Sequence, residues 1–431
     1  MTFRFSATTA VGAAALILGL TAPVAQAAPK QPIRVAPAQA APAPQELDPS
    51  FYEPPRRTYV NKRPGEILAA RRITAATFGV TPMNVDAWQL SYRSTNSRGE
   101  PIAAVTTLLK PRGRSAGPRK LVSMQMAEDS LAGYCATSYA VQQGSWSALA
   151  GQIGVPGEMS IVQDMLDQGW AVSLPDHQGP KHAYAAGPLG ARITLDGLRA
   201  AKRFAPIGID DESPIAMYGY SGGAIVTGHA AELRKTYAPE LNIVGAAEGG
   251  VPADLKVVLN TAQNNATSGL VLAAVFGVAR EYPYFQRFLD QHLNADGKAL
   301  RAAKAPLCVG LQPEVLPFLN IKGLLRWRGD PVTAPPVKRL LDETRMGKAV
   351  PDFPMYVWNS ADDEIIPVSQ VDTLVRTYCR DPHASVAYTR YHHSEHVMTE
   401  LAGASPAVRW IKARLDGKPT GAGCVTRNVR K

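Results

Sequence analysis

Apolar runs alternate with amphipathic segments between about residue 85 and residue 250. Two strand-like runs, residues 88–93 and 102–109, flank a polar stretch that contains Gly99 and predict an antiparallel hairpin. The other predicted elements before the centre of the chain are strands at residues 121–126 and 170–174 and helices at residues 160–166 and 194–204. Strands interleaved with helices are typical of an α/β fold with a mostly parallel sheet.

The pattern changes between residues 252 and 345, where helical segments rich in Leu, Ala, Phe and Tyr are broken by Pro and Gly. This change predicts an inserted helical cap or lid. Its segment 270–278 is almost wholly apolar, which favours buried cap core over a lipid-facing lid. The sheet pattern then resumes with strands at residues 355–358 and 385–391 and helices at residues 370–380 and 397–415.

The N-terminus has the pattern of an export signal. Arg4 precedes a short apolar run at residues 11–20, and Ala25-Gln26-Ala27 is a small-x-small cleavage site. We expect a secreted or envelope protein that begins near Ala28, with a membrane anchor as the alternative. Residues 28–50 are rich in Ala and Pro, which predicts a disordered leader.

These patterns divide the chain into consecutive parts. They are a signal peptide (1–27), a leader (28–50), the first part of the α/β core (51–251), a helical cap or lid (252–345) and the second part of the core (346–431).

The chain carries a net charge of +10, but no Arg/Lys run with interleaved aromatic residues indicates nucleic-acid binding. A solvated basic surface is favoured, and anionic envelopes or a lipid–water interface are the possible partners. The four cysteines, in an exported chain, predict two disulfides, with three pairings open. Because there is no Cys-x-x-Cys element, zinc and redox chemistry are not expected. The oligomeric state is not predicted.

A nucleophile-elbow pattern follows the strand-like residues 214–218. Gly219-Tyr220-Ser221-Gly222-Gly223 places a serine between glycines, as a very tight strand-to-helix turn requires. A serine hydroxyl at neutral pH needs an imidazole base and a carboxylate to act as a nucleophile. In α/β-hydrolases these residues follow in the order Ser, Asp or Glu, His.

Candidate acids lie directly after the strand at residues 355–358. Asp363 is favoured because its spacing to Pro367 matches the usual turn at the acid. Asp362 is the second choice, and Glu364 is a residue that could hold a neighbouring loop. The order Ser, acid and base requires the histidine to come later still.

Candidate bases lie beyond the last strand. His396 is favoured because it directly precedes the closing helix, whereas His392 and His393 adjoin the strand and are expected at the surface. His177 follows a strand end and is a candidate to line the site.

The oxyanion formed in acyl transfer needs hydrogen-bond donors. One donor should be the backbone N–H of Gly222, next to the nucleophile. The second should come from the loop at residues 126–130, in which Asp129 or a neighbour is the candidate.

Taken together, these residues resemble those of the secretory lipase family of the α/β-hydrolase superfamily. The resemblance covers residues 85–424 and is carried by Gly219-Tyr220-Ser221-Gly222-Gly223, Glu128-Asp129-Ser130, Cys135, Ser138-Tyr139, Pro175-Asp176, Asp363-Glu364-Ile365-Ile366-Pro367, Cys379 and Glu395-His396. Gln178 departs from it, since an acidic residue is expected after Pro175-Asp176-His177.

The resemblance implies an α/β-hydrolase fold with a helical lid. It implies Ser221 as nucleophile, Asp363 as acid and His396 as base, with Asp129 and Gly222 in the oxyanion hole. It also implies the disulfides Cys135–Cys308 and Cys379–Cys424. Acyl-enzyme chemistry on a serine uses no metal or organic cofactor, and none is expected.

The leading hypothesis is a secreted serine hydrolase that cleaves acylglycerols or other lipid esters through an acyl-enzyme. An envelope acyltransferase or a short-chain esterase would use the same residues. A non-catalytic lipid-binding protein on a hydrolase scaffold is the alternative from another class, and the complete set of Ser221, Asp363 and His396 disfavours it.

Overall fold

The computed structural model describes residues 1–2, 33–39, 41–313, 317–421 and 423–430. The chain divides into residues 1–32 and residues 33–431, and the second unit holds every element described below. The predicted signal peptide lies outside the described residues except for its first two.

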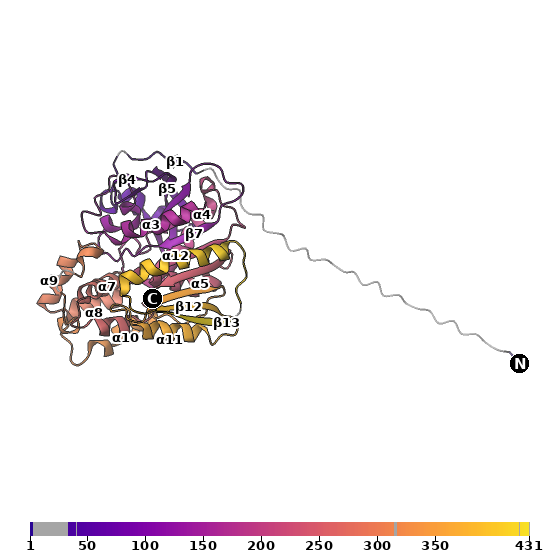
Figure 1. Ribbon diagram of the computed structural model, residues 1–431. Coiled ribbons are helices and arrows are strands. Elements are labelled where there is room, and N and C mark those ends of the chain that lie inside the picture. The colour runs from indigo at the N-terminus through magenta and orange to yellow at the C-terminus, as the bar shows by residue number, and fades with distance from the viewer. Residues whose placement is uncertain (3–32, 40, 314–316, 422, 431) are drawn as a thin grey trace. The chain divides into compact units, whose positions relative to one another are not determined.

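The second unit is built on one large sheet, and Figure 1 shows several of its strands with helices around them. In the part of the chain that the structure describes, the sheet has 11 strands in the order β1-β2-β5-β6-β8-β7-β9-β10-β11-β12-β13. They are β1 (Val35–Ala36), β2 (Ile67–Ile73), β5 (Val85–Thr95), β6 (Pro101–Pro111), β7 (Leu121–Gln125), β8 (Ala171–Pro175), β9 (Ile215–Tyr220), β10 (Ile243–Gly249), β11 (Met355–Ser360), β12 (Ser385–Tyr391) and β13 (Gly423–Val429). A separate ribbon pairs β3 (Ala76–Thr77) with β4 (Thr81–Pro82).

The pairs β2–β5, β5–β6 and β6–β8 are antiparallel. Pairing is parallel between β1 and β2 and from β8 through β7 to β13. The predicted hairpin is therefore confirmed as β5 and β6, with Gly99 in the turn at a φ of 83°. Parallel strands place their carboxyl ends at one edge of a sheet. The loops after β7, β9, β11 and β12 consequently meet there.

Helices cover both faces of the sheet. Helices α3 (Gly154–Asp167) and α12 (His396–Leu415) pack on one face, and α4 (Gly187–Arg203), α5 (Gly222–Tyr237) and α11 (Val368–Tyr378) pack on the other. Helix α3 begins before the predicted capping box at Ser160, which lies within the helix. Pro156 suits the first turn, where the backbone N–H that proline lacks has no partner within the helix.

Part of the segment predicted as a disordered leader is ordered. Val35–Ala36 pairs with β2, and a helical turn (η1, Gln45–Leu47) and α1 (Pro49–Tyr52) follow. The Glu46 carboxylate accepts a hydrogen bond from the N–H of Gly133 at 2.7 Å. Composition misleads here because polar contacts made by Glu46 and Tyr52 hold an Ala/Pro-rich segment on the core.

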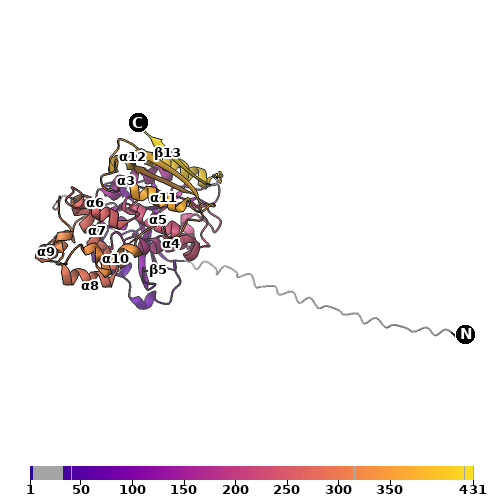
Figure 2. The same cartoon turned by 90° about the horizontal axis from the view of Figure 1, so that it is seen from below.

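A helical segment separates β10 from β11 and lies within residues 252–345, the range of the predicted cap. It contains α6 (Leu255–Ala262), α7 (Ser268–Glu281), α8 (Pro283–His292), α9 (Ala295–Lys304) and α10 (Pro335–Glu343). Figures 1 and 2 both show α7 to α10 gathered beside one end of the sheet. Among the described residues, no helix combines the length and apolarity needed to cross a membrane.

Candidate active site

Ser221 lies at a tight turn between β9 and α5. Its φ of 48° and ψ of −116° are unusual for a residue with a side chain. The flanking glycines have no room for a side chain. A Cβ on Gly219 would lie 2.3 Å from Thr227 Oγ1, and one on Gly223 would lie 2.0 Å from the carbonyl oxygen of Gln125. The elbow geometry therefore needs glycine at both positions.

A continuous chain of hydrogen bonds joins the serine to a histidine and an aspartate. Ser221 Oγ is 2.9 Å from His396 Nε2, and His396 Nδ1 is 2.8 Å from Asp363 Oδ2. Because an ionised carboxylate only accepts hydrogen bonds, Nδ1 carries the proton and Nε2 is free to accept from the serine. This is the arrangement that activates a serine for attack on an acyl carbon.

The environment of His396 favours its charged form. Burial alone lowers the pKa of His396, but the hydrogen bond and charge of Asp363, with further negative charge from Glu364 and Glu400, raise it above the usual value. Asp363 is held in turn because its Oδ1 accepts the backbone N–H groups of Ile365 and Ile366, at 3.0 and 2.7 Å.

The alternative acids and bases have other contacts. Asp362 accepts the backbone N–H of His393 at 2.8 Å, and Glu364 accepts the backbone N–H of His396 at 3.0 Å. His392 Nε2 contacts Asn428 at 3.0 Å. The structure thus brings Asp363 and His396, rather than these neighbours, to Ser221.

Asp129 and Gly222 lie against each other beside the elbow. A Cβ on Gly222 would lie 1.7 Å from Asp129 Oδ1, so the carboxyl group fills the space above this glycine. Asp129 is buried, and Oδ1 has no hydrogen-bond partner among the described residues. Burial raises the pKa of Asp129 to about 7, although a hydrogen bond with Tyr184 opposes the shift. Asp129 is thus a carboxyl group that retains its proton close to neutral pH.

Two residues after β8 hold the loop that carries Asp129. Gln178 Nε2 donates to Glu128 Oε1 at 2.8 Å and to the Ser130 carbonyl at 2.9 Å. An ionised acidic side chain in place of Gln178 would face the Glu128 carboxyl group without those donors. His177 Nε2 contacts the Met126 carbonyl at 2.8 Å, and burial lowers the pKa of this histidine to about 4. His177 is a buried neutral support of the loop.

Sequence reasoning missed two tyrosines. Tyr184 hydrogen-bonds to Asp129 from an irregular loop that no local pattern marks. Tyr220 is the second residue of the elbow motif, directly before the serine, where the pattern accepts any side chain. Its hydroxyl donates to the His396 carbonyl at 2.6 Å, and the two rings lie 5.1 Å apart.

The structure contains both disulfides that the resemblance implies. Cys135–Cys308 joins the region after the Asp129 loop to the helical segment, and Cys379–Cys424 joins the end of α11 to β13. Among the described residues, no cluster of three or more His, Cys, Asp and Glu side chains is arranged to hold a metal ion.

Comparison with known proteins relates this site to one family. Residues 146–423 match the model of the secretory lipases. Lipase A of Arthroderma benhamiae is 34% identical, over 96% of this chain and 89% of that protein. A Mycobacterium tuberculosis protein named as a probable inactive lipase is 32% identical, over 86% of this chain and 83% of that protein. The X-ray structure of Candida antarctica lipase A in its closed state has a TM-score of 0.82 and 29% identity, and the match covers 91% of each chain.

The fold comparison agrees with the sequence comparison over nearly the whole second unit. The chain belongs to the secretory lipase family, a family of lipase-like ester hydrolases with the α/β-hydrolase fold.

Proposed function

We propose that this protein is an exported serine hydrolase that cleaves acylglycerols or other lipid esters through an acyl-enzyme. Ser221, His396 and Asp363 would be the nucleophile, base and acid. Asp129 and Gly222 would stabilise the oxyanion.

The observation that carries the proposal is the hydrogen-bonded chain from Ser221 Oγ through His396 to Asp363. Family membership alone does not establish activity, because one similar protein is named as a probable inactive lipase. The two distances of 2.9 and 2.8 Å support activity here, since the proton of the serine can pass directly to the imidazole.

The mechanism follows from these contacts. His396 Nε2 takes the proton of Ser221 as Oγ attacks the ester carbonyl carbon, and Asp363 stabilises the imidazolium that forms. The imidazolium then gives this proton to the leaving alcohol as the ester C–O bond breaks, which leaves the acyl group on Ser221. Water, deprotonated by the same nitrogen, releases the acid and restores the serine.

The tetrahedral intermediate puts negative charge on the former carbonyl oxygen. Gly222 is the first residue of helix α5, so its backbone N–H lies at the positive end of the helix dipole. This N–H would donate a hydrogen bond to the negative oxygen. Asp129 would add a second donor in its protonated form, and burial favours that form.

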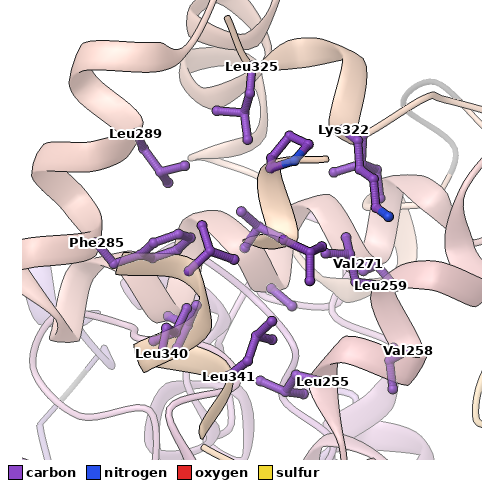
Figure 3. A pocket seen from close by; sticks show the side chains of 17 residues that line it. Leu255, Val258, Leu259, Val271, Phe285, Leu289, Lys322, Leu325, Leu340 and Leu341 are labelled. Atoms are coloured by element: carbon purple, nitrogen blue, oxygen red, sulfur yellow. The ribbon is translucent and has the colours of Figure 1, made fainter. Parts of the chain in front are cut away.

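An apolar cavity in the helical segment supports a lipid acyl group as substrate. Figure 3 shows its side chains pointing inward, and Lys322 is the charged residue among them. Its walls include Val271, Phe285, Leu289, Leu325, Leu340 and Leu341. Helix α7 lines this cavity, and on the same helix Gly277 lies against Tyr184, the partner of Asp129. A cavity this apolar suits an alkyl chain, and we propose that residues 252–345 form the cap that receives it.

Export and contact with a lipid surface complete the proposal. The two disulfides fit an oxidising compartment, as the predicted signal peptide requires. Next to His396, the side chains of Val397, Met398 and Leu401 are 57%, 55% and 59% exposed. They form an apolar patch on the first turns of α12, suited to rest on a lipid–water interface.

Labelling with a fluorophosphonate tests the chemistry. We expect one adduct on Ser221 and none in Ser221→Ala, which should also lose ester hydrolysis while it remains folded. Absence of labelling in the wild type, or activity in the variant, would overturn the mechanism. Esters of increasing acyl length, assayed with and without an added alcohol, then separate a lipase from a short-chain esterase and from an acyltransferase.

A further inference from the structure

Two carboxyl groups that the proposed mechanism does not use lie beside the site, Glu158 buried and Glu400 partly buried. Glu158 is on α3 and is 3% exposed, and Glu400 is on α12. Oε1 of each glutamate is buried and has no hydrogen-bond donor among the described residues. The two carboxyl groups are instead close enough to each other for one to donate a hydrogen bond to the other. Carboxylates only accept hydrogen bonds, so two carboxyl groups can bond in this way only if one of them keeps a proton.

Glu158 also holds the loop that carries Asp129. Its Oε2 accepts the backbone N–H of Ala127 at 2.7 Å. The carbonyl of Ala127 lies against the start of α3, where a Cβ on Gly154 would be 2.4 Å from the oxygen. Helix α3 therefore contacts both the backbone N–H and the backbone carbonyl of Ala127, two residues before Asp129.

Glu400 connects the same pair to the base. It follows His396 by four residues on α12, a spacing that puts both side chains on one face of the helix. The charge of Glu400 is among those that favour protonated His396, after Asp363 and Glu364. The charge of His396 in turn favours ionised Glu400.

Several other titratable groups surround the pair. Burial raises the pKa of both glutamates. The charge of Asp129 on the loop raises the pKa of Glu158 further, whereas the charge of His396 on α12 lowers that of Glu400. Burial raises the pKa of Tyr218 on β9, and the charges of both glutamates and of Tyr356 on β11 raise it further. Burial likewise raises the pKa of Tyr220, and the charge of Glu400 is among those that add to the shift. In this set His396 is the group that becomes positive. A single proton shared by the glutamates keeps the pair from adding two negative charges to a buried region.

We propose that Glu158 and Glu400 share one proton and act as positioning residues, tying the Asp129 loop to helix α12 and setting a carboxylate beside His396. Glu158 is the acid, with Oε1 donating to Glu400 while Oε2 accepts from Ala127. The inference rests on the proposed roles of Asp129 and His396. Loss of the shared proton would leave two carboxylates that repel and would loosen the loop.

The test compares variants of the full chain. The variants are Glu158→Gln, Glu158→Leu and Glu400→Gln, with Glu248→Gln as the matched control because Glu248 is buried and has no hydrogen bond within the described residues. The measurements are kcat and KM for a soluble p-nitrophenyl ester between pH 5 and pH 9, and hydrogen exchange of the backbone amide of Ala127.

Each variant has a distinct expected result. Glu400→Gln should lower the midpoint of the acid limb of kcat/KM by about half a pH unit or more, because the charge beside His396 is gone. Glu158→Leu should lower kcat about tenfold with little change in KM and speed exchange at Ala127, because the loop loses its acceptor. Glu158→Gln should restore both properties, since an amide can accept from Ala127 and donate to Glu400. The control should leave the acid limb and the Ala127 exchange unchanged.

Three outcomes would overturn the inference. They are an unchanged acid limb in folded Glu400→Gln, unchanged kcat and exchange in Glu158→Leu, or equal damage from Gln and Leu at residue 158. Failure of the proposed function would give a different result. The wild type would then lack ester hydrolysis, while hydrogen exchange at Ala127 would still show whether Glu158 holds the Asp129 loop.

Discussion

The carboxyl group of Asp129 occupies the space where a side chain on residue 222 would begin, 1.7 Å from the Cβ position of Gly222. The two residues come from separate loops, after β7 and after β9. Gly222 therefore has a role that the spacing of the elbow motif alone does not explain.

Gly222→Ala should displace Asp129 and lower kcat about 100-fold, the cost typical of losing one oxyanion donor, with the fold retained. The measurement is kcat on a soluble ester together with thermal unfolding. Gly157→Ala is the matched control, because a Cβ at this helical position meets nothing within 4 Å. Equal effects from both variants would contradict the prediction.

The protonation of Asp129 should appear in the alkaline limb of activity. Burial raises its pKa to about 7, so the donor form is present below that pH and is lost as the pH rises through it. Asp129→Asn keeps a donor at every pH, and we expect its kcat to fall less steeply between pH 7 and pH 9. Asp129→Leu should lose activity at all pH values. If Asn and wild type have the same alkaline limb, protonated Asp129 is not the donor.

The acid is tested by a pair of adjacent aspartates. Asp363→Asn should lower kcat about 1,000-fold or more, because the amide no longer fixes the tautomer of His396 or stabilises its charge. Asp362→Asn should change kcat by less than about threefold, because among the described residues the Asp362 side chain accepts a hydrogen bond from the backbone N–H of His393 and does not reach His396. In the wild type the acid limb of kcat/KM should have its midpoint above 6.5, since the pKa of His396 is raised. The reverse ranking of the two variants would reassign the acid.

Glu248 should set part of the pH dependence of stability. It lies in β10 beneath α5, fully buried, and burial, with a smaller contribution from the charge of Glu232, raises its pKa to about 8. Its contribution to stability is full below about pH 4.5, the value of a free glutamate, and is lost as the pH rises through 8. Glu248→Gln should flatten the decline of Tm over that range, whereas Glu212→Gln at an exposed residue should not. Parallel curves for wild type and Glu248→Gln would refute this.

The apolar patch on α12 should affect activity on emulsified lipid but not activity on a soluble ester. Replacing Met398 and Leu401 with serine should lower the ratio of emulsion activity to soluble-ester activity about tenfold, because two side chains lose burial in lipid. Val425→Ser is the control, since Val425 is equally exposed (57%) but pairs with Ala387, far along β12 from His396. An unchanged ratio would remove the patch from the proposed interface.

The elements of the core could be predicted because hydrophobic periodicity is local. The hairpin of β5 and β6, the strand before the elbow and the amphipathic helix α11 follow directly from residue spacing. The start of α3 was misplaced, because a capping box at Ser160 is a weak local signal and packing decided where the helix begins. The ordered residues of the predicted leader depend on distant partners such as Gly133, which composition does not reveal.

The fold class, the elbow and the order of Ser221, Asp363 and His396 could be predicted from the amino-acid sequence, because strand-to-helix turns and motif order are local properties of the chain. The three-dimensional contacts were needed to show which acid and which histidine meet the serine, and that Asp129 lies on Gly222 with Tyr184 as its partner. They were also needed to show that Glu158 and Glu400, far apart in sequence, lie in contact behind the site. Local patterns do not reveal these contacts because they join loops and helices from distant parts of the chain, and burial then changes the protonation of the groups that meet.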